Sequence, residues 1–423
     1  MGNLNLPVVL YGAGSRAAFE KKQAELYGLN PACFVDADVR KQGGVCCGLP
    51  VLSLKQVKGK YGEFYVYLTP GWEKHREIFD CLIEQGIKQE RILNYSEMEK
   101  CLGCEELDSS LYAYSSSLIS CCRSNDSMKE SEVFWKNNDW DMEGAVLEYI
   151  SMKDRLIRSI KNEEVCRCTG CSNIKNEMRP VRKTAKLLAL SIEQLCQLSC
   201  VYCVYKNEES IFYAKANDRH FVRDFDYKRF IEILDRRELL SYDAVILLTG
   251  GEITISPRVD EILDAVQEYR LQVLTNAVIY NERIAELTAR PGSCVNISVD
   301  AGTRQTYKLV KGVDAFDKVW TNIKKYKGCG VTVFVKYVFL EENSNEADVM
   351  GFIHEAVKAG VNGNDTIMIS ADYYRKVYCT QEQMRLMAKM LSIAEQNEIS
   401  WYIVQTFKPD EKAEILRLKS EMN

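Results

Sequence analysis

The sequence predicts an α/β protein whose main part is a partial (β/α)6 barrel, preceded by a small Rossmann-like domain and a helical linker that contains cysteines. Two observations predict the barrel: six short apolar runs follow residue 183, and helical stretches separate them. Strands that alternate with helices form parallel βαβ units. A third observation predicts the Rossmann-like domain: near the start of the chain, a strand, a glycine turn, a helix and a second strand follow one another.

The chain divides into three expected domains, because 423 residues are enough for two or three domains that each bury a core. We expect a Rossmann-like, nucleotide-binding-like domain over residues 1–100, a helical linker region with a cysteine cluster over 101–182, and the barrel with C-terminal helices over 183–423. In such barrels the chemistry lies at the carboxyl ends of the strands. The six predicted barrel strands are KLLALS (186–191), YDAVILLTG (242–250), LQVLTNA (271–277), SCVNISVD (293–300), VTVFVKYVF (331–339) and DTIMIS (365–370).

The first glycine turn of the chain fits a dinucleotide-binding pattern. Gly12, Gly14 and Ala17 follow an apolar run and match G-x-G-x-x-A, and Asp36 ends the next predicted strand. Glycines at such a turn let the backbone approach a phosphate, and the helix that follows favours negative charge. The alternative is a structural turn with nothing bound. The region also resembles N-terminal domains that accompany sugar-modifying and acyl-transferring enzymes, a resemblance that assigns no residue a role.

Composition and charge exclude several classes of protein. A net charge of −5 gives no reason to expect nucleic acid as a partner. No apolar run approaches the roughly 20 residues that a membrane span needs, and the first residues lack the basic segment of an export signal. We therefore expect a cytoplasmic protein whose 17 cysteines are mostly reduced. The sequence also lacks Walker A, G-x-S-x-G and D-x-H-x-x-G patterns.

Three cysteines lie in one short loop just after the first predicted barrel strand. Cys196, Cys200 and Cys203 are separated by three and then two residues in LCQLSCVYCVY. Structural zinc takes four ligands, and the sequence offers no fourth ligand nearby. A redox dithiol needs only a C-x-x-C pair, which leaves Cys196 unexplained. A cubane iron–sulfur cluster normally uses four thiolates, and with only three it has one iron open to another ligand.

This loop resembles the signature of the radical S-adenosylmethionine (radical SAM) superfamily, and the resemblance covers about residues 183–375. Further motifs follow in the family's order: an aromatic residue before the last cysteine, a G-G-E motif after the second strand, and polar residues after the third and fourth. Ile253 departs from the pattern, since many members have proline there. The matching positions are Tyr202, Gly250, Gly251, Glu252, LTNA (274–277) and SVD (298–300).

The resemblance implies a 4Fe–4S cluster on the three loop cysteines, with SAM chelating the open iron. It implies that reductive cleavage of SAM gives methionine and a 5′-deoxyadenosyl radical, which takes hydrogen from a substrate carbon. Polar strand-end capping is the alternative for Ser298 and Asp300, and a turn role is the alternative for Asn276. The residues implied to contact SAM are Tyr202, Gly250, Gly251, Glu252, Asn276, Ser298 and Asp300.

A second group of cysteines lies just before the barrel. VCRCTGCSN places Cys166, Cys168 and Cys171 too close together for ordinary core filling. One hypothesis is an auxiliary 4Fe–4S cluster, which members of the family often carry, with a fourth ligand from the substrate or from a distant cysteine. A zinc clip and metal-free surface thiols are the other interpretations. The distant candidates are Cys101, Cys104, Cys121, Cys122 and Cys379.

The stretch SVDAGTRQTYKLVKG resembles radical SAM proteins found alongside glycosyltransferases and in polysaccharide or natural-product assembly. This resemblance implies a small-molecule or sugar-conjugate substrate, dehydrogenation or epimerisation at a carbinol carbon, and an external electron donor such as a flavodoxin or ferredoxin. Peptide maturation is the alternative within the family, and an iron–sulfur sensor that binds a nucleotide through residues 1–100 is the alternative outside it. Cys379, just past the last predicted strand, is a candidate hydrogen donor for an epimerase, with a structural role or a distant cluster ligand as alternatives.

Overall fold

The protein is described by a computed structural model that carries side chains. The structure describes residues 6–114, 117–121, 132–134, 141–181, 183–203, 206, 225–372, 378–404 and 406–422. Cys122, one of the distant cysteine candidates, lies outside them.

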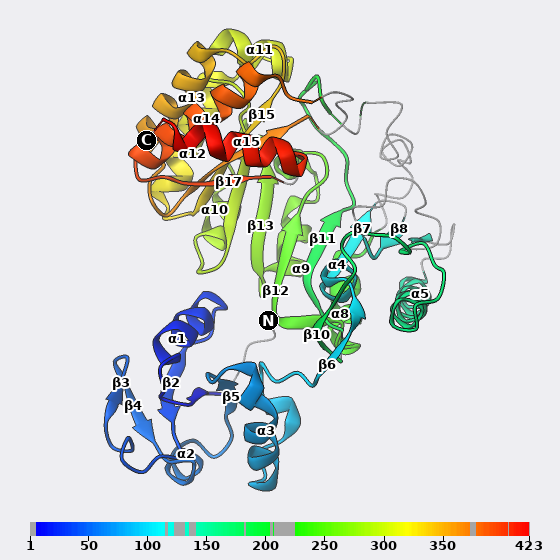
Figure 1. Cartoon of the computed structure of the whole chain (residues 1–423), viewed down its shortest axis with the longest axis vertical. Helices are drawn as coiled ribbons and strands as arrows, with labels where there is room; N and C mark the ends of the chain where they lie inside the picture. Colours follow the sequence, from blue (N-terminus) through cyan, green and yellow to red (C-terminus); the bar gives the residue numbers. More distant parts are fainter. Residues whose placement is uncertain are drawn as a thin grey trace.

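A ten-stranded sheet forms the main body of the molecule (Figure 1). From β17 through β7 all neighbours are parallel, and the last two strands, β8 and β9, are antiparallel. All six predicted strands belong to this sheet, which confirms the parallel (β/α) architecture. In spatial order the strands are β17 (Ser400–Ile403), β16 (Thr366–Ala371), β15 (Val333–Phe339), β14 (Cys294–Ser298), β13 (Arg270–Thr275), β12 (Leu240–Leu248), β11 (Ala185–Ser191), β7 (Ser110–Tyr114), β8 (Ser117–Ile119) and β9 (Glu132–Phe134).

Helices cover one face of this sheet, and alternate strand residues form the core beneath them. Ile297 and Val335, for example, are fully buried in the same core as Tyr307 and Phe352 of the helices. Successive side chains on a strand point to opposite faces, so the residues between them face the inner side. The helices of this part are α8 (Tyr227–Arg236), α9 (Val259–Val266), α10 (Glu282–Thr288), α11 (Arg304–Lys311), α12 (Phe316–Gly328), α13 (Glu346–Lys358), α14 (Gln381–Gln396) and α15 (Pro409–Ser420).

The linker region is helical only in part, which corrects the expectation for residues 101–182. Its helices are α4 (Glu105–Ser109) and α5 (Met142–Lys161), while β7, β8 and β9 extend the large sheet and β6 (Met98–Gly103) pairs with β10 (Lys175–Pro180). The physical reason is that β11 has an edge whose backbone groups need partners, and β7 supplies them. Residues Ser110–Tyr114 and Ser117–Ile119, in the tyrosine- and serine-rich part of the linker, therefore belong to the sheet.

The N-terminal unit contains a second sheet, which lies below strands β12 and β13 in Figure 1. Its strand order is β3-β4-β2-β1-β5, with β4, β2, β1 and β5 parallel. Among all described residues, no helix is both long and apolar enough to cross a membrane. The elements are β1 (Val8–Tyr11), α1 (Ala17–Leu26), β2 (Pro31–Val35), β3 (Val45–Cys46), β4 (Leu49–Leu52), α2 (Leu54–Tyr61), β5 (Tyr65–Leu68), η1 (Trp72–Lys74), α3 (His75–Glu84) and η2 (Gln89–Arg91).

Candidate functional site

The cysteine loop, residues 196–203, follows β11 at the carboxyl end of the large sheet. Cys196 is exposed, and Cys200 and Cys203 are partly buried. Burial raises the pKa of Cys200, whereas the Lys311 ammonium lowers it. The Cys203 N–H donates to the Cys200 carbonyl at 3.2 Å, so these two cysteines lie in one tight turn. Among the described residues, no three histidine, cysteine, aspartate or glutamate side chains already stand in a metal-binding arrangement. Three neighbouring thiols without a fourth are nevertheless the donor set that suits a 4Fe–4S cluster with one open iron.

The C-terminal end of α11 packs against the cysteine loop through backbone hydrogen bonds. The Ser199 N–H donates to the Lys311 carbonyl at 3.0 Å, and the Val201 N–H donates to the Val310 carbonyl at 3.0 Å. Gly312 ends the helix in the left-handed region with φ of 75°, and a Cβ there would lie 3.0 Å from the Ser199 Cβ. The position therefore favours glycine both for its conformation and for the close approach of the loop.

The G-G-E turn packs directly against the chain that leads into the cysteine loop. The Gly251 N–H donates to the Glu193 carbonyl at 3.0 Å, and the Glu252 N–H donates to the Leu195 carbonyl at 2.5 Å. A Cβ at Gly251 would lie 2.0 Å from the Leu195 carbonyl oxygen, and one at Gly250 would lie 2.5 Å from that of Glu193. Both glycines are therefore required by the approach of two backbones.

The Glu252 carboxylate joins the ends of β12 and β13. It is buried and accepts hydrogen bonds from the hydroxyls of Thr254 and Thr275, both at 2.7 Å, and from the Asn276 N–H at 2.6 Å. Both of its oxygens are thus used within the protein. Hydrogen bonds to a charged acceptor of this kind contribute about 1.5–3 kcal/mol each. Glu252 therefore positions the turn and Asn276 rather than presenting a free carboxylate.

Asn276 connects the end of β13 to the cysteine loop. Its amide nitrogen donates to the Cys196 sulfur at 3.8 Å and to the Gln197 side-chain oxygen at 3.3 Å. Its amide oxygen accepts from the Gln197 side chain at 3.2 Å and from the Val278 N–H at 3.0 Å. The structure therefore brings Asn276, Glu252 and the first cysteine together, as members of one site.

Asp300 and Tyr202, both predicted to contact SAM, share a network of hydrogen bonds within the protein. Its carboxylate accepts hydrogen bonds from the Lys311 ammonium and the Tyr202 hydroxyl, and from the Val338 N–H at 2.7 Å. The ammonium also donates to the Tyr202 hydroxyl at 2.7 Å. The side chains of Asp300 and Lys311 are 0% and 1% exposed. A buried carboxylate needs a charged partner, and α11 supplies it directly under the cysteine loop.

Ser298 and Lys336 form a polar pair on the inner face of the sheet. They stand opposite each other in the register of β14 and β15, so both side chains emerge on the same face. No hydrogen bond or ion pair of either side chain occurs within the described part of the chain. Burial lowers the pKa of Lys336, while Asp300 raises it. Asp300 is already bonded to Lys311, so among the residues that the structure describes Lys336 has no counter-ion of its own.

Three of these positioning residues, Gln197, Lys311 and Lys336, were not among the residues predicted from the sequence. The only signal in the sequence is that Lys311 precedes a glycine at the end of a helical stretch. That signal predicts a helix end, and it does not predict a partner on the next strand.

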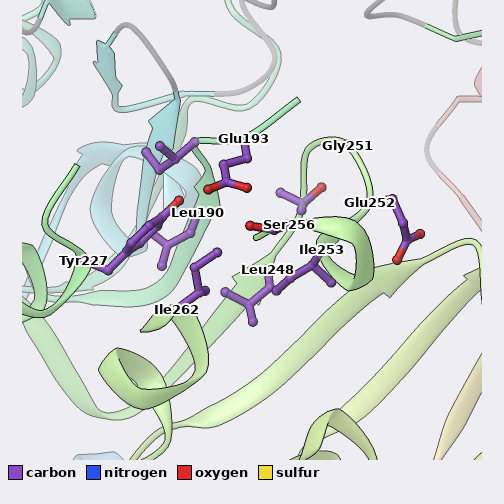
Figure 2. A pocket seen from close by; sticks show the side chains of 11 residues that line it. Leu190, Glu193, Tyr227, Leu248, Gly251, Glu252, Ile253, Ser256 and Ile262 are labelled. Atoms are coloured by element: carbon purple, nitrogen blue, oxygen red, sulfur yellow. The ribbon is translucent and has the colours of Figure 1, made fainter. Parts of the chain in front are cut away.

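A cavity lies behind the G-G-E turn (Figure 2). Leu190, Leu248 and Ile262, which line it, belong to the core on the helix-covered side of the sheet. Glu193 and Tyr227 point toward one another at its wall. Burial raises the pKa of Tyr227, and the Glu193 carboxylate adds to this effect. The cavity therefore lies on the opposite side of the sheet from Ser298 and Lys336.

Other predicted candidates lie away from the cysteine loop. Cys166 and Cys168 pack against the main core and Cys171 is exposed. Cys379 is partly buried, and its N–H donates to the Glu411 carboxylate at 2.7 Å. In the N-terminal unit, Gly12 of the glycine turn lies close to Thr69, and a Cβ at Gly14 would meet nothing within 4 Å. A Cβ at Gly12 would lie 2.7 Å from the Thr69 hydroxyl.

Comparison with known protein families finds a match over this part of the chain. The family model for the Radical SAM superfamily matches residues 190–356, which contain the cysteine loop, the G-G-E turn and the ends of β13, β14 and β15. A probable GTP 3′,8-cyclase from Saccharolobus islandicus is 28% identical over 178 residues, which are 41% of this chain and 54% of the relative. One from Pyrococcus abyssi is 28% identical over 140 residues, 33% and 42% of the two chains. The match thus spans about half the length of these curated relatives.

The solved structures that match this chain have lower sequence identity to it than these relatives. Streptococcus suis SuiB bound to S-adenosylmethionine has a TM-score of 0.42 at 13% identity, covering 62% of this chain and 59% of its own. A radical SAM methyltransferase from Sphaerobacter thermophilus has a TM-score of 0.39 at 11% identity, covering 63% and 84%. Neither similarity supports an inference about activity.

Proposed function

This chain carries a radical SAM domain, and we propose that it is an enzyme that cleaves SAM reductively and uses the 5′-deoxyadenosyl radical to take hydrogen from a substrate carbon. The observation that carries the proposal is the meeting of three elements at one end of the sheet. The segment that leads into the cysteine loop contacts the G-G-E turn through the Glu193 and Leu195 carbonyls, and the loop itself contacts Asn276 through Cys196 and Gln197.

The residues present suit a 4Fe–4S cluster with SAM on its open iron. Cys196, Cys200 and Cys203 would hold the cluster, which when reduced supplies the electron that splits SAM into methionine and the radical. The protein's own contribution is positional. Glu252 and Asn276 hold the loop on one side, and Lys311 with Asp300 holds it on the other. The Lys311 ammonium also lowers the pKa of Cys200, against the larger effect of burial, and so favours its thiolate form.

We further propose a small polar substrate with an anionic group, and a sugar conjugate as the first candidate class. The inner face offers the Lys336 ammonium and the Ser298 hydroxyl, which have no partners in the described chain and stand on paired positions. A cation beside a hydroxyl binds a carboxylate or phosphate through charge-assisted hydrogen bonds. Dehydrogenation or epimerisation at a carbinol carbon is the chemistry proposed for such a substrate, with an external electron donor such as a flavodoxin or ferredoxin.

Two other functions remain as outcomes of the test. Peptide maturation would require a peptide substrate in place of the sugar conjugate. A sensor would bind SAM or a nucleotide without turnover. The hydrogen-donor role of Cys379 belongs only to the epimerisation variant, and Cys379→Ala should then abolish solvent-deuterium incorporation into product while hydrogen abstraction continues.

The decisive experiment is anaerobic reconstitution with iron and sulfide, followed by measurement of 5′-deoxyadenosine from SAM under dithionite. We expect the wild type to form it and Cys200→Ala to give none above background. Cys329→Ala, which changes an exposed cysteine outside the loop, is the matched control and should behave as wild type. A wild type that is fully loaded with iron and still forms no 5′-deoxyadenosine would favour the sensor and overturn the enzyme.

A further inference from the structure

The N-terminal unit packs against the amino-terminal ends of strands in the large sheet (Figure 1). The Tyr27 ring, just after α1, has its centroid 4.7 Å from the Arg270 guanidinium carbon and 6.2 Å from the Tyr242 ring, which it meets edge to face. A Cβ at Gly292 would lie 2.2 Å from the Leu26 carbonyl oxygen and 2.7 Å from the Arg270 Cδ. The end of α1, the start of β13 and the loop before β14 therefore meet in one junction, where the close approach requires glycine.

A cavity of about 410 Å³ lies at this junction. Small-molecule sites have volumes of about 300–1,000 Å³ and occur preferentially between domains. The apolar part of the lining includes Val8, Leu29 and the Tyr27 ring, and the polar part includes Arg270 and Arg290. The cavity therefore suits a small molecule with one apolar and one charged end.

The two arginines of the cavity form no ion pair within the described part of the chain. The Arg270 guanidinium donates to the Asp243 backbone carbonyl, and its Nε is buried without a hydrogen-bond partner. Arg290 is exposed and donates to the Gln267 carbonyl at 2.5 Å. Among the described residues that line the cavity, Glu268 is the one acid, and it is exposed. The lining therefore carries two positive charges and one negative charge.

The cavity lies at the opposite end of the sheet from the cysteine loop. The Leu271 N–H donates to the Ser293 hydroxyl oxygen at 2.9 Å, which holds the loop before β14 against the start of β13. Arg270 begins β13, and Asn276, which contacts Cys196, follows its end. At about 3.3 Å per residue, roughly 20 Å of strand separate the two sites. A molecule bound in the cavity is therefore distinct from the substrate of the proposed reaction.

We propose that this cavity binds a small organic anion, with its carboxylate or phosphate group on Arg270 and Arg290 and its apolar body against Tyr27 and Leu29. Guanidinium groups bind such anions through charge-assisted and often bidentate hydrogen bonds. The anion also supplies a partner for a largely buried cation. Because both the N-terminal unit and the barrel line the cavity, the bound molecule stabilises the contact between them.

The first test is calorimetric titration of the full chain with phenyl phosphate, benzoate and phenol at one ionic strength. We expect at least one of the two anions to bind saturably, and phenol to bind about 10-fold more weakly because it lacks the charged group. The anion that binds more tightly identifies the group as phosphate or carboxylate. No saturable binding of either anion up to about 10 mM, or equal binding of phenol, would overturn the site.

The second test assigns the binding to the two arginines. Arg290→Gln and Arg270→Gln should each weaken anion binding by about 10-fold or more, whereas Arg155→Gln, at an exposed position on α5, should not. Circular dichroism shows whether each variant is folded, and the exposed Arg290 keeps the test valid if Arg270→Gln does not fold. Unchanged binding in Arg290→Gln would overturn the site. Loss of binding in Lys336→Met would place the anion on the inner face of the barrel and would also overturn it.

The third test changes the junction without changing a charge. Gly292→Ala places a Cβ against the Leu26 carbonyl and the Arg270 side chain, and anion binding should weaken by about 10-fold, the equivalent of one lost charged hydrogen bond. Gly330→Ala is the matched control, because its φ of 78° is close to the 76° of Gly292 and its Cβ would meet nothing within 4 Å. Equal binding in these two variants would overturn the junction as the site. None of these outcomes depends on 5′-deoxyadenosine formation, so this site and the proposed reaction are judged separately.

Discussion

Two strand ends in this chain share the sequence Val-Asp-Ala and use the aspartate differently. Asp36 follows β2 in the N-terminal unit, where its carboxylate accepts from the Ala13 N–H of the glycine turn at 2.8 Å and from the partly exposed Lys41 at 2.9 Å. Asp300 follows β14, where its carboxylate bonds to Lys311 with both side chains fully buried. The first aspartate joins the glycine turn after β1 to a surface lysine, and the second pairs with a buried lysine beside the cysteine loop.

The difference lies in what the fold sets opposite each strand end. In the N-terminal unit, Gly12 lies close to Thr69, and the partner of Asp36 is the surface residue Lys41. In the barrel the neighbour is the end of α11, which carries both Lys311 and the support of the cysteine loop. Identical local sequence therefore acquires a structural role in one place and a role in the site in the other.

The sharpest test of this comparison removes the partner lysine at each end. Lys311→Met leaves the Asp300 carboxylate buried without its charge partner, and we expect a loss of about 3–5 kcal/mol in the free energy of unfolding. Lys41→Met removes a partner at the surface, and about 1 kcal/mol or less is expected. Urea denaturation of the full chain measures both, with the exposed Lys308→Met as a control on α11. Equal losses at the two ends would break the comparison.

A second test concerns the glycine that touches the cysteine loop. Gly251→Ala places a Cβ against the Leu195 carbonyl oxygen and should displace the loop, with a loss of about 100-fold in 5′-deoxyadenosine formation and a reduced iron content. Gly328→Ala, where a Cβ meets nothing within 4 Å, is the matched control and should leave both unchanged. Normal iron content and activity in Gly251→Ala would mean that the contact does not position the loop.

The inner-face cation gives a third test, of function rather than stability. Lys336→Met should raise the KM for an anionic substrate by about 10–100-fold, because a charged hydrogen bond contributes about 1.5–3 kcal/mol. Lys336→Arg should recover part of this effect. The anionic group that Lys336 binds could belong to the substrate or to SAM, and measuring the KM for SAM in the same variants distinguishes the two. A change confined to SAM would assign Lys336 to the cosubstrate, and no change in either KM would remove it from the site.

The smallest effect is expected at Asp36. Burial alone would raise the pKa of Asp36, but hydrogen bonds from Lys41, Asp38 and Ala13 lower it overall. The ionised carboxylate therefore stabilises the unit above the pKa of an unfolded aspartate, about 4, and this contribution is lost as the pH falls below that value. Asp36→Asn should cost about 1–2 kcal/mol at neutral pH and flatten this acid dependence, without changing 5′-deoxyadenosine formation.

The sequence predicted the repeating architecture better than the linker. Each of the six apolar runs is a strand, because an apolar run between helices has few alternatives to a parallel, covered strand. The linker contains short strands whose pairing depends on the free edge of β11. The local sequence of the linker does not indicate that this edge is available. The helix α5 was predictable from its amphipathic residues, and its contact with β8 through Met152 was not.

For the site, the sequence by itself indicated the candidate residues: three cysteines at a fixed spacing, two glycines before a glutamate, and polar strand ends. Spacing along one loop and glycine requirements are local properties, so they are visible in the chain. Only the tertiary structure decided that the Glu252 carboxylate accepts a hydrogen bond from Asn276, and that the Asp300 carboxylate pairs with the Lys311 ammonium. These contacts depend on partners from other elements, and the free energy of pairing a buried charge is set by that three-dimensional neighbourhood.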